Sequence, residues 1–341
     1  MIVALGNLYY FPLKLYVFVA SYFYFRKLSV VGRENIPRQG PLIYAINHQN
    51  ALLDALLLSV LTWRNPHFLT RSDVFNNRYV NQFLRGLKML PIYRIRDGFG
   101  DVKKMMPSFG DQRHTDQRRC CGHIPGRESQ PAIQNQTAEK GLARIAFMSE
   151  EATNFTLNVQ VVPIGIQYES YFGTKGRTLV NIGKPIAVAD FREAYLHDPG
   201  KASDQLLAAI SASLKSLVLH IQSQEQYDRV LEQYHQRRVH KINLCEQLGA
   251  DQALISAIEG GEEFTGQADQ PGMAWRFLDG GIRLMRSIIG FVPGWCIDKI
   301  VSRTVKDEHF TGTMRFAYSI FLYPPILFLM YLCIKIIIGL F

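Results

Sequence analysis

The chain has 341 residues, of which 48% are hydrophobic and 20% are charged, and its formal net charge at pH 7 is +9. This apolar content excludes a chain that is disordered throughout, and the length suffices for one large core with appendages. The basic excess suits nucleic acid, anionic lipid or a phosphorylated substrate, and charge alone does not choose among them. The five cysteines form neither an even framework nor a metal-ligand spacing, which fits a reducing compartment.

Residues 1–27 form an apolar and aromatic segment in which Lys14 is the only charged residue before Arg26. The segment lacks a small-residue cleavage site, which argues against a secretory signal peptide. Aromatic rings settle at the depth of lipid headgroups, and the basic residues that follow suit anionic phosphates. We therefore expect an N-terminal membrane-anchoring segment of the interfacial kind.

Residues 28–190 alternate between strand and helix patterns, which predicts an α/β domain with helices flanking a sheet. Asn50 is a suitable cap for the helix that follows the second strand. The predicted strands are residues 28–31, 42–46, 67–70, 90–95, 159–167 and 177–182, and the predicted helices are residues 51–61, 74–89 and 139–154.

Residues 191–315 are predicted to be a mostly helical C-terminal region, with a linker over residues 260–272. A second apolar stretch, residues 282–300, could pack on a membrane face. Residues 316–341 carry one charge, Lys335, in a run long enough to enter or cross a bilayer. Pro324 and Pro325 should break this run, so a bent or re-entrant helix is expected as readily as a straight span. The alternative is a buried helix of a soluble protein.

The chemistry is predicted around His48 and Asp54. His48 follows an apolar strand and precedes a helix, which places it at the edge of a sheet where α/β sites gather. Asp54 lies in the first turns of that helix and can reach back toward the imidazole. A carboxylate on one ring nitrogen fixes the tautomer of a histidine that takes a proton on the other, which is the arrangement of a general base. An unrelated histidine and aspartate would be the ordinary alternative for such a pair alone.

Neighbouring motifs favour the functional interpretation. Arg71 opens the next helix, and the predicted strand over residues 90–95 leads into Arg94 and Arg96, whose planar guanidiniums suit a phosphate. A buried strand further on contains Pro163. In this order, the Asn47-His48…Asp54 block, the arginine-bearing strand and the Val-Pro strand resemble the glycerol-3-phosphate and lysophosphatidic acid acyltransferase family. The resemblance covers residues 28–186.

This resemblance implies an α/β fold, a glycerolipid acyltransferase-like sheet flanked by helices, with hydrophobic N-terminal and C-terminal membrane segments. It implies acyl transfer from a thioester donor, acyl-CoA or acyl carrier protein, to glycerol-3-phosphate or its 1-acyl derivative, with no further cofactor and no metal. His48 would be the base and Asp54 its orienting partner. Arg94 would bind the acceptor phosphate, with Arg96 and Arg71 as weaker candidates. The expected location is the membrane, with the active site facing the cytoplasm and membrane lipids as partners.

One departure from the family concerns spacing. Five residues separate His48 from Asp54, whereas the commonest family form has four. One added residue turns a side chain by about 100° around a helix, so the helix must start later or the preceding loop must bulge. By resemblance, the longer spacing is that of some branches of the family that act on glycerol-3-phosphate. It therefore slightly favours glycerol-3-phosphate as the expected acceptor.

The larger departure is the segment of residues 105–137. The family has a helix here and then a buried strand ending in Phe-Pro-Glu-Gly, whereas this segment is polar and has no helical or strand period. An inserted loop is the ordinary explanation. With suitable synonymous codons, however, residues 122–128 encode Val-Ile-Phe-Pro-Glu-Gly in the neighbouring reading frame. We hypothesise two compensating frame changes, which would leave a core strand absent and the activity of this chain weak.

Four alternatives compete with this function. A silent membrane protein could keep the fold as a lipid-binding homologue, and a thioester hydrolase would use the same His48 and Asp54. Nucleic-acid binding is disfavoured because the basic residues do not form one groove-sized stripe. Metal binding by Cys120, Cys121 and His123 with His114 is disfavoured because the spacing matches no standard zinc pattern.

Overall fold

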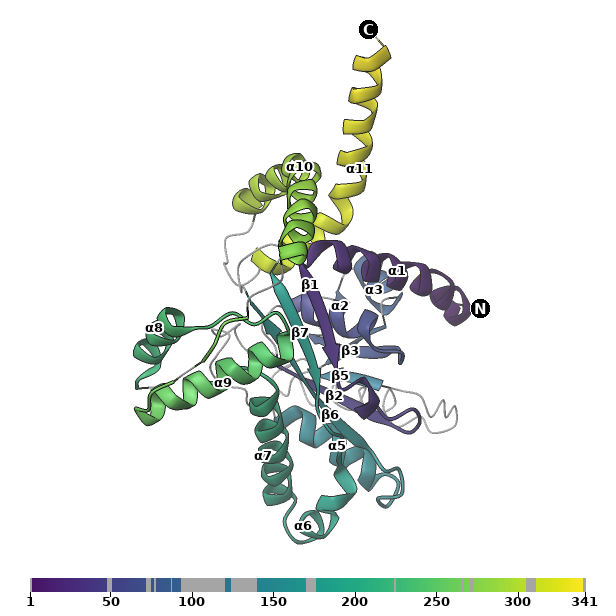
Figure 1. Cartoon of the computed structure of the whole chain (residues 1–341). Helices are drawn as coiled ribbons and strands as arrows, with labels where there is room; N and C mark the ends of the chain where they lie inside the picture. Colours follow the sequence, from purple (N-terminus) through teal and green to yellow (C-terminus); the bar gives the residue numbers. More distant parts are fainter. Residues whose placement is uncertain are drawn as a thin grey trace.

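The structure is a computed structural model, and it describes residues 2–47, 51–71, 75–76, 78–86, 88–92, 120–123, 140–169, 176–223, 225–264, 266–269, 273–304 and 311–339. Helices cover both faces of a mixed sheet, and a long C-terminal helix projects from the body of the molecule (Figure 1).

The sheet brings together strands from residue 27 to residue 187. In spatial order they are β1 (Lys27–Val31), β7 (Arg177–Ile182), β6 (Gln160–Tyr168), β2 (Leu42–Ile46), β5 (Cys120–His123), β3 (Pro66–Arg71) and β4 (Met89–Ile92), and β8 (Ile186–Ala187) pairs with β6. The strands from β6 to β4 are mutually parallel, whereas β7 is antiparallel to β6 and parallel to β1. The C-terminal ends of the five parallel strands therefore lie at one edge, together with the N-terminal ends of β1 and β7. We call this the C-terminal edge.

The central strand β2 shows why a continuous apolar run forms a strand here. All five of its residues are buried, because helices cover both faces of the sheet. Leu42, Tyr44 and Ile46 point into one hydrophobic core, and Ile43 and Ala45 point into the other, as the two-residue repeat of a strand requires. Both cores therefore depend on the register of this strand.

Each core lies between the sheet and one layer of helices (Figure 1). On one face lie α1 (Ile2–Tyr24) and α2 (Ala51–Leu61), and on the other lie α5 (Lys140–Glu151) and α7 (Pro199–Leu217). α7 begins with proline at its first position, and the Asp198 side chain accepts hydrogen bonds from the N–H groups of Gly200 and Lys201. A third core joins α8 (Tyr227–Arg237) and α9 (Leu244–Gly260) to Leu179 of β7.

The remaining helices are α3 (Arg78–Gly86), α6 (Arg192–His197), α10 (Met273–Thr304) and α11 (Thr311–Gly339). The helix expected over residues 74–89 is wrong at its C-terminal end, because β4 already begins at Met89. Lys88 takes a positive φ of 60° and its N–H bonds to the carbonyl of Arg85, so a tight turn ends the helix. The bounds expected for β2, α2 and β7 agree with the structure.

The segment of residues 105–137 contains a strand that the sequence did not predict. Within it, residues 120–123 are described, and they form β5 between β2 and β3. Cys120 pairs with Leu42 on one side and with Pro66 on the other. The expectation that this segment has no strand, so that a core strand is absent, is therefore wrong. Backbone pairing with two ordered neighbours outweighs the poor strand propensity of these residues. The rest of the segment lies outside the described residues.

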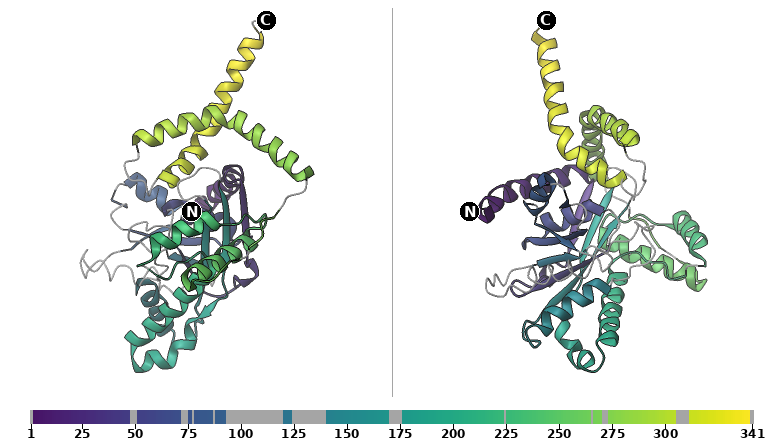
Figure 2. Two further views of the ribbon diagram at one scale, coloured as in Figure 1. Left: turned by 60° about the vertical axis from the view of Figure 1, so that its left-hand side comes forward. Right: turned by 180° about the vertical axis from the view of Figure 1, so that it is seen from behind.

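The C-terminal helix α11 runs through Pro324 and Pro325 as one continuous helix. It is bent, which is one of the forms expected from the two prolines, and its far part leads away from the body (Figures 1 and 2). Within the described residues, one stretch is long and apolar enough to cross a membrane, Met314–Leu332 of α11. The N-terminal segment forms α1, and its anchoring role stays a prediction.

Candidate active site

Asn47 fixes the end of β2 against β6. Its side-chain Nδ2 donates to the carbonyl of Ile166 at 3.0 Å, and its Oδ1 accepts from the N–H of Ile166 at 2.6 Å. Its own backbone N–H donates to the carbonyl of Ile164 at 3.3 Å. The side chain thus replaces a strand residue in the ladder and is 3% exposed. The backbone that enters position 48 is therefore held at the C-terminal edge.

Asp54 lies in the first turn of α2, fully buried, and it too is bound to β6. The hydroxyl of Tyr168, the last residue of β6, donates to Asp54 Oδ1 at 2.6 Å. A buried carboxyl group without such a partner would be costly, so this bond also sets the direction of the side chain. β6 consequently holds both the residue before His48 and the predicted partner of His48.

Tyr168 is the residue that sequence reasoning missed. It is buried, and its ring lies 6.3 Å from that of Phe25, which follows α1. Tyrosine at the end of an apolar strand is common, and only the pairing of β6 beside β2 reveals that its hydroxyl meets Asp54. Sequence spacing could not show this, because 114 residues separate the two.

The structure brings the other predicted residues together only in part. Arg71 ends β3, which places its backbone at the C-terminal edge. Pro163 lies within β6 and pairs with Ala45, so it supports the strand and does not itself reach the edge. His48, Arg94 and Arg96 lie outside the described residues, and their roles stay predictions.

An aromatic contact joins this edge to the C-terminal helix. The ring of Phe316, in the first turns of α11, lies 6.2 Å from that of Phe25 and 5.0 Å from that of Tyr24. Phe316 and Ile320 are buried in the same core as Ile46 and Tyr168. The start of α11 is therefore part of the domain core beside the candidate site.

A buried cation lies further along the same edge, at the start of β7. The Arg177 guanidinium contacts Glu169 at 2.8 Å, the carbonyl of Lys241 at 2.6 Å and Gln247 Oε1 at 3.2 Å. Burial opposes the ionisation of Glu169, but the hydrogen bonds and charge of Arg177 outweigh it and lower the pKa of Glu169 below its ordinary value of 4.5. These contacts connect Glu169 beside the sheet to Lys241 and Gln247 in the helical region. We therefore assign Arg177 to holding the helical region on the sheet.

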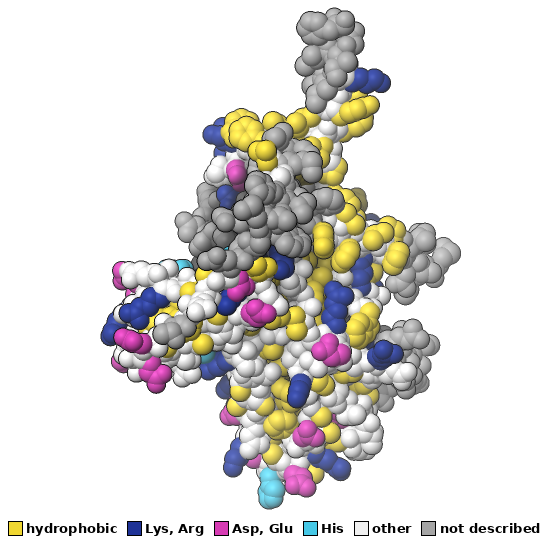
Figure 3. Space-filling view, viewed as in Figure 1, with side chains coloured by type: hydrophobic (Ala, Val, Ile, Leu, Met, Phe, Trp, Pro, Cys, Tyr) yellow, Lys and Arg dark blue, Asp and Glu magenta, His cyan; other side chains and the backbone are white. Residues whose placement is uncertain are grey.

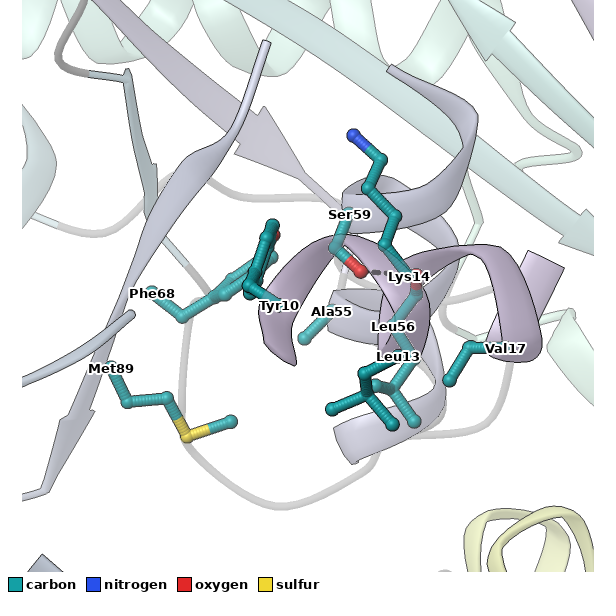
Figure 4. Close-up of a pocket in the computed structure, with 9 residues that line it drawn as sticks. All are labelled: Tyr10, Leu13, Lys14, Val17, Ala55, Leu56, Ser59, Phe68 and Met89. Atoms are coloured by element: carbon teal, nitrogen blue, oxygen red, sulfur yellow. Dashed lines mark hydrogen bonds between the residues drawn. The ribbon is translucent and has the colours of Figure 1, made fainter. Parts of the chain in front are cut away.

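A small cavity lies between α1, α2 and the starts of β3 and β4 (Figure 4). Its volume is about 30 Å³, close to the share of one water molecule in the liquid, so this cavity is packing space and does not accommodate a substrate as it stands. Burial raises the pKa of the lining residue Tyr10 to about 12. The lining residues are Tyr10, Leu13, Lys14, Val17, Ala55, Leu56, Ser59, Phe68 and Met89.

Comparison with known proteins identifies the domain. The family model described as "Acyltransferase" matches residues 27–167, which run from the first residue of β1 to one residue before Tyr168. A lysophosphatidic acid acyltransferase from Thermotoga maritima, PlsC, is 18% identical over 55% of this chain and 72% of its own, with a TM-score of 0.37. Among curated proteins no match was found.

The fold and the match together define a class: an α/β domain with its candidate site at the ends of parallel strands. In residues 27–167 the chain carries a domain of the acyltransferase family. The resemblance seen in the sequence motifs is thereby confirmed at the level of the family.

Proposed function

We propose that this protein is a membrane-attached acyltransferase of glycerophospholipid synthesis. It would transfer a fatty acyl chain from acyl-CoA or acyl carrier protein to glycerol-3-phosphate or 1-acyl-glycerol-3-phosphate. The observation that carries the proposal is Asp54, buried and fixed by Tyr168 at the start of the helix that follows His48 in the chain, in a domain that matches the acyltransferase family. The proposal needs no cofactor or metal besides the acyl donor.

His48 would take the proton of the acceptor hydroxyl as its oxygen attacks the thioester carbonyl carbon. The carbon–sulfur bond then breaks, and the leaving thiolate receives the proton, so no acyl-enzyme forms. Such general-base assistance is typically worth about a hundred- to ten-thousandfold in rate. Asp54 would support the imidazolium, with Tyr168 and Asn47 as positioning residues.

The acceptor phosphate would be bound by Arg94, with Arg96 and Arg71 as further cations at the same edge. Arg71 ends β3 and Arg94 follows β4, and these two strands are parallel neighbours. Their ends lie at the edge to which Asn47 and Asp54 belong. A phosphate between them would hold the acceptor hydroxyl beside the base.

Membrane attachment suits an acceptor and a product with acyl chains. α11 would enter the bilayer, and the domain would lie on the cytoplasmic side, where the soluble acyl donors are found. The apolar stretch in α11 supports this proposal.

The alternative is a catalytically impaired lipid-binding homologue. One observation favours it: β5 is built from Cys120–His123, and the segment after it lacks the Phe-Pro-Glu-Gly motif that the family resemblance implies.

An assay decides among these. Purified wild-type protein, His48→Ala and Asp54→Asn would each receive labelled acyl-CoA or acyl carrier protein with either acceptor. We expect acylated glycerophosphate from the wild type and a loss of about a hundredfold or more in His48→Ala. Donor loss that does not depend on an acceptor would indicate a hydrolase, and no product from the wild type would favour the impaired homologue.

A further inference from the structure

Helix α10 exposes an apolar stripe to solvent. Leu284, Phe291 and Trp295 follow one another at spacings of seven and four residues, which places them on one side of the helix. Their exposed fractions are 63%, 71% and 58%, and the neighbouring Val292 is 40% exposed. On a helix that faces water, these positions are ordinarily polar.

The opposite side of α10 is buried at three positions. Pro293, Ile297 and Val301 are buried, and α10 packs extensively along α11. An ion pair between Arg315 Nε and Asp298 Oδ1 at 3.1 Å joins the two helices. The exposed stripe is thus not the face that α11 covers, and no residue that the structure describes covers it.

The continuation of α11 indicates what covers the exposed stripe of α10. Ile320 is the last buried residue of α11, and beyond it Phe321, Phe328, Leu329 and Tyr331 are at least 58% exposed. Residues 321–339 extend about 28 Å at 1.5 Å per residue, close to the thickness of the hydrocarbon layer of a bilayer. A lipid bilayer around this part of α11 would begin where α10 lies.

The arrangement in space agrees with a helix on a bilayer surface. α11 projects from the body, while α10 lies across its base in two arms that meet at a bend, and neither arm continues in the direction of α11 (Figure 2, left). Hydrophobic side chains gather around the base of the projecting helix (Figure 3). α10 also carries five arginines and lysines against two aspartates, which complements anionic headgroups.

We propose that α10 is an interfacial helix that lies in the headgroup layer of an anionic phospholipid bilayer, with Phe291 and Trp295 inserted toward the acyl chains. Tryptophan prefers this depth, and Lys299 and Arg303 in its last turns suit lipid phosphates. Because Phe316 and Phe25 tie the start of α11 to the C-terminal edge, the contact also holds that edge near the membrane surface. The inference rests on the proposed membrane attachment.

Tryptophan fluorescence tests this depth. The variant W63F/W275F keeps Trp295, and W275F/W295F keeps Trp63, a control that is exposed to a similar degree, 50%. Trp63 follows the C-terminal end of α2 and precedes β3, which places it at the opposite edge of the sheet. Both full-length variants would be reconstituted into vesicles of phosphatidylcholine and phosphatidylglycerol in equal parts, with lipids brominated near the headgroup or near the chain end.

We expect Trp295 to be quenched more strongly than Trp63, and more strongly by the shallow bromines than by the deep ones. Quenching of Trp295 no stronger than that of Trp63 would overturn the inference, and stronger quenching by the deep bromines would show a helix inside the hydrocarbon. Flotation of the same samples distinguishes failure of membrane attachment from failure of the role proposed for α10. Protein that does not float with the vesicles contradicts membrane attachment itself, whereas protein that floats with an unquenched Trp295 contradicts only the role of α10. Neither readout requires turnover.

Discussion

The hydroxyl of Tyr168 is the side-chain contact through which β6 acts on Asp54. A buried carboxyl that must face an imidazole has several rotamers, and a fixed hydrogen bond on Oδ1 selects among them. The bond comes from a strand end and not from a loop, so the sheet itself positions Asp54, the predicted partner of His48.

Replacing this tyrosine tests that positioning. We expect Tyr168→Phe to lower kcat about tenfold with little change in KM, since a hydrogen bond to a charged group is worth about 1.5–3 kcal/mol. The matched control is Tyr195→Phe, which removes a tyrosine–carboxylate hydrogen bond of 3.2 Å to Glu151 far from the site. Steady-state kinetics with thermal melts would check this. Equal kcat in both variants would exclude a positioning role for Tyr168.

A second prediction at this scale concerns the contribution of Asn47 to stability. Asn47→Ala leaves the N–H and carbonyl of Ile166 without their side-chain partner, so we expect a loss of about 1–3 kcal/mol in the free energy of unfolding. Asn35→Ala, which removes one partly buried bond to the carbonyl of Ile182, should cost less. Denaturant unfolding measures both, and a larger loss in Asn35→Ala would contradict this account of β2.

The residues that carry sequence motifs could be predicted, and those that act through the sheet could not. The motif around His48 indicated Asp54, because the two lie within one strand–turn–helix unit. The role of Tyr168 depends on the strand order, which places β6 directly beside β2 although most of the domain separates them in the chain. Asn47 appeared only as part of the motif, and its bonds to Ile166 depend on the same pairing.

Among the elements, β5 shows where local patterns fail. The other strands of the sheet's centre are apolar runs, whereas Cys120–His123 is neither apolar throughout nor β-branched, and only its neighbours make it a strand. With suitable synonymous codons, residues 119–123 encode Val-Val-Val-Val-Ile in the frame that also contains Phe-Pro-Glu-Gly. Such a run is typical of a buried parallel strand. The position of β5 is therefore compatible with the hypothesis of compensating frame changes.

The coding DNA tests that hypothesis directly. We expect the codons of residues 119–128 to read through these motifs in the neighbouring frame, and codons that cannot do so would end the idea. A chain in which the alternative frame replaces residues 105–139 should unfold at a higher temperature and turn over faster than the printed chain. Thermal melts and the acyltransfer assay measure the two effects.

Acid should weaken the joint at Arg177, where the helical region meets the sheet. The pKa of Glu169 is lowered in the folded state, so its contribution to stability is present above its ordinary pKa of 4.5 and is lost as the pH falls through the folded value. We expect the wild type to be more stable than Glu169→Gln at neutral pH and this difference to shrink below pH 4.5. Denaturant unfolding across pH measures it, and a constant difference would contradict the assignment.

At the scale of the whole molecule, α11 has two parts with different surroundings. Its first turns are buried beside the site, and the part beyond Ile320 is exposed and apolar. Cutting the chain after Ile320 should weaken attachment to membranes and keep the domain folded, whereas cutting before Thr311 also removes Phe316 and should lower the melting temperature. Membrane sedimentation and thermal melts separate these effects. Equal melting temperatures would show that Phe316 does not support the core.

The stacking of Phe25 on Phe316 also constrains how the protein is made. These rings lie far apart in the sequence, so the core beside Asp54 stays incomplete until Phe316 has been synthesised and has left the ribosome. At about 5–20 residues per second, the N-terminal strands wait many seconds for their last partner. That partner belongs to the same helix that we propose enters the bilayer. On that proposal, completion of the domain core and attachment to the membrane depend on the same part of the chain.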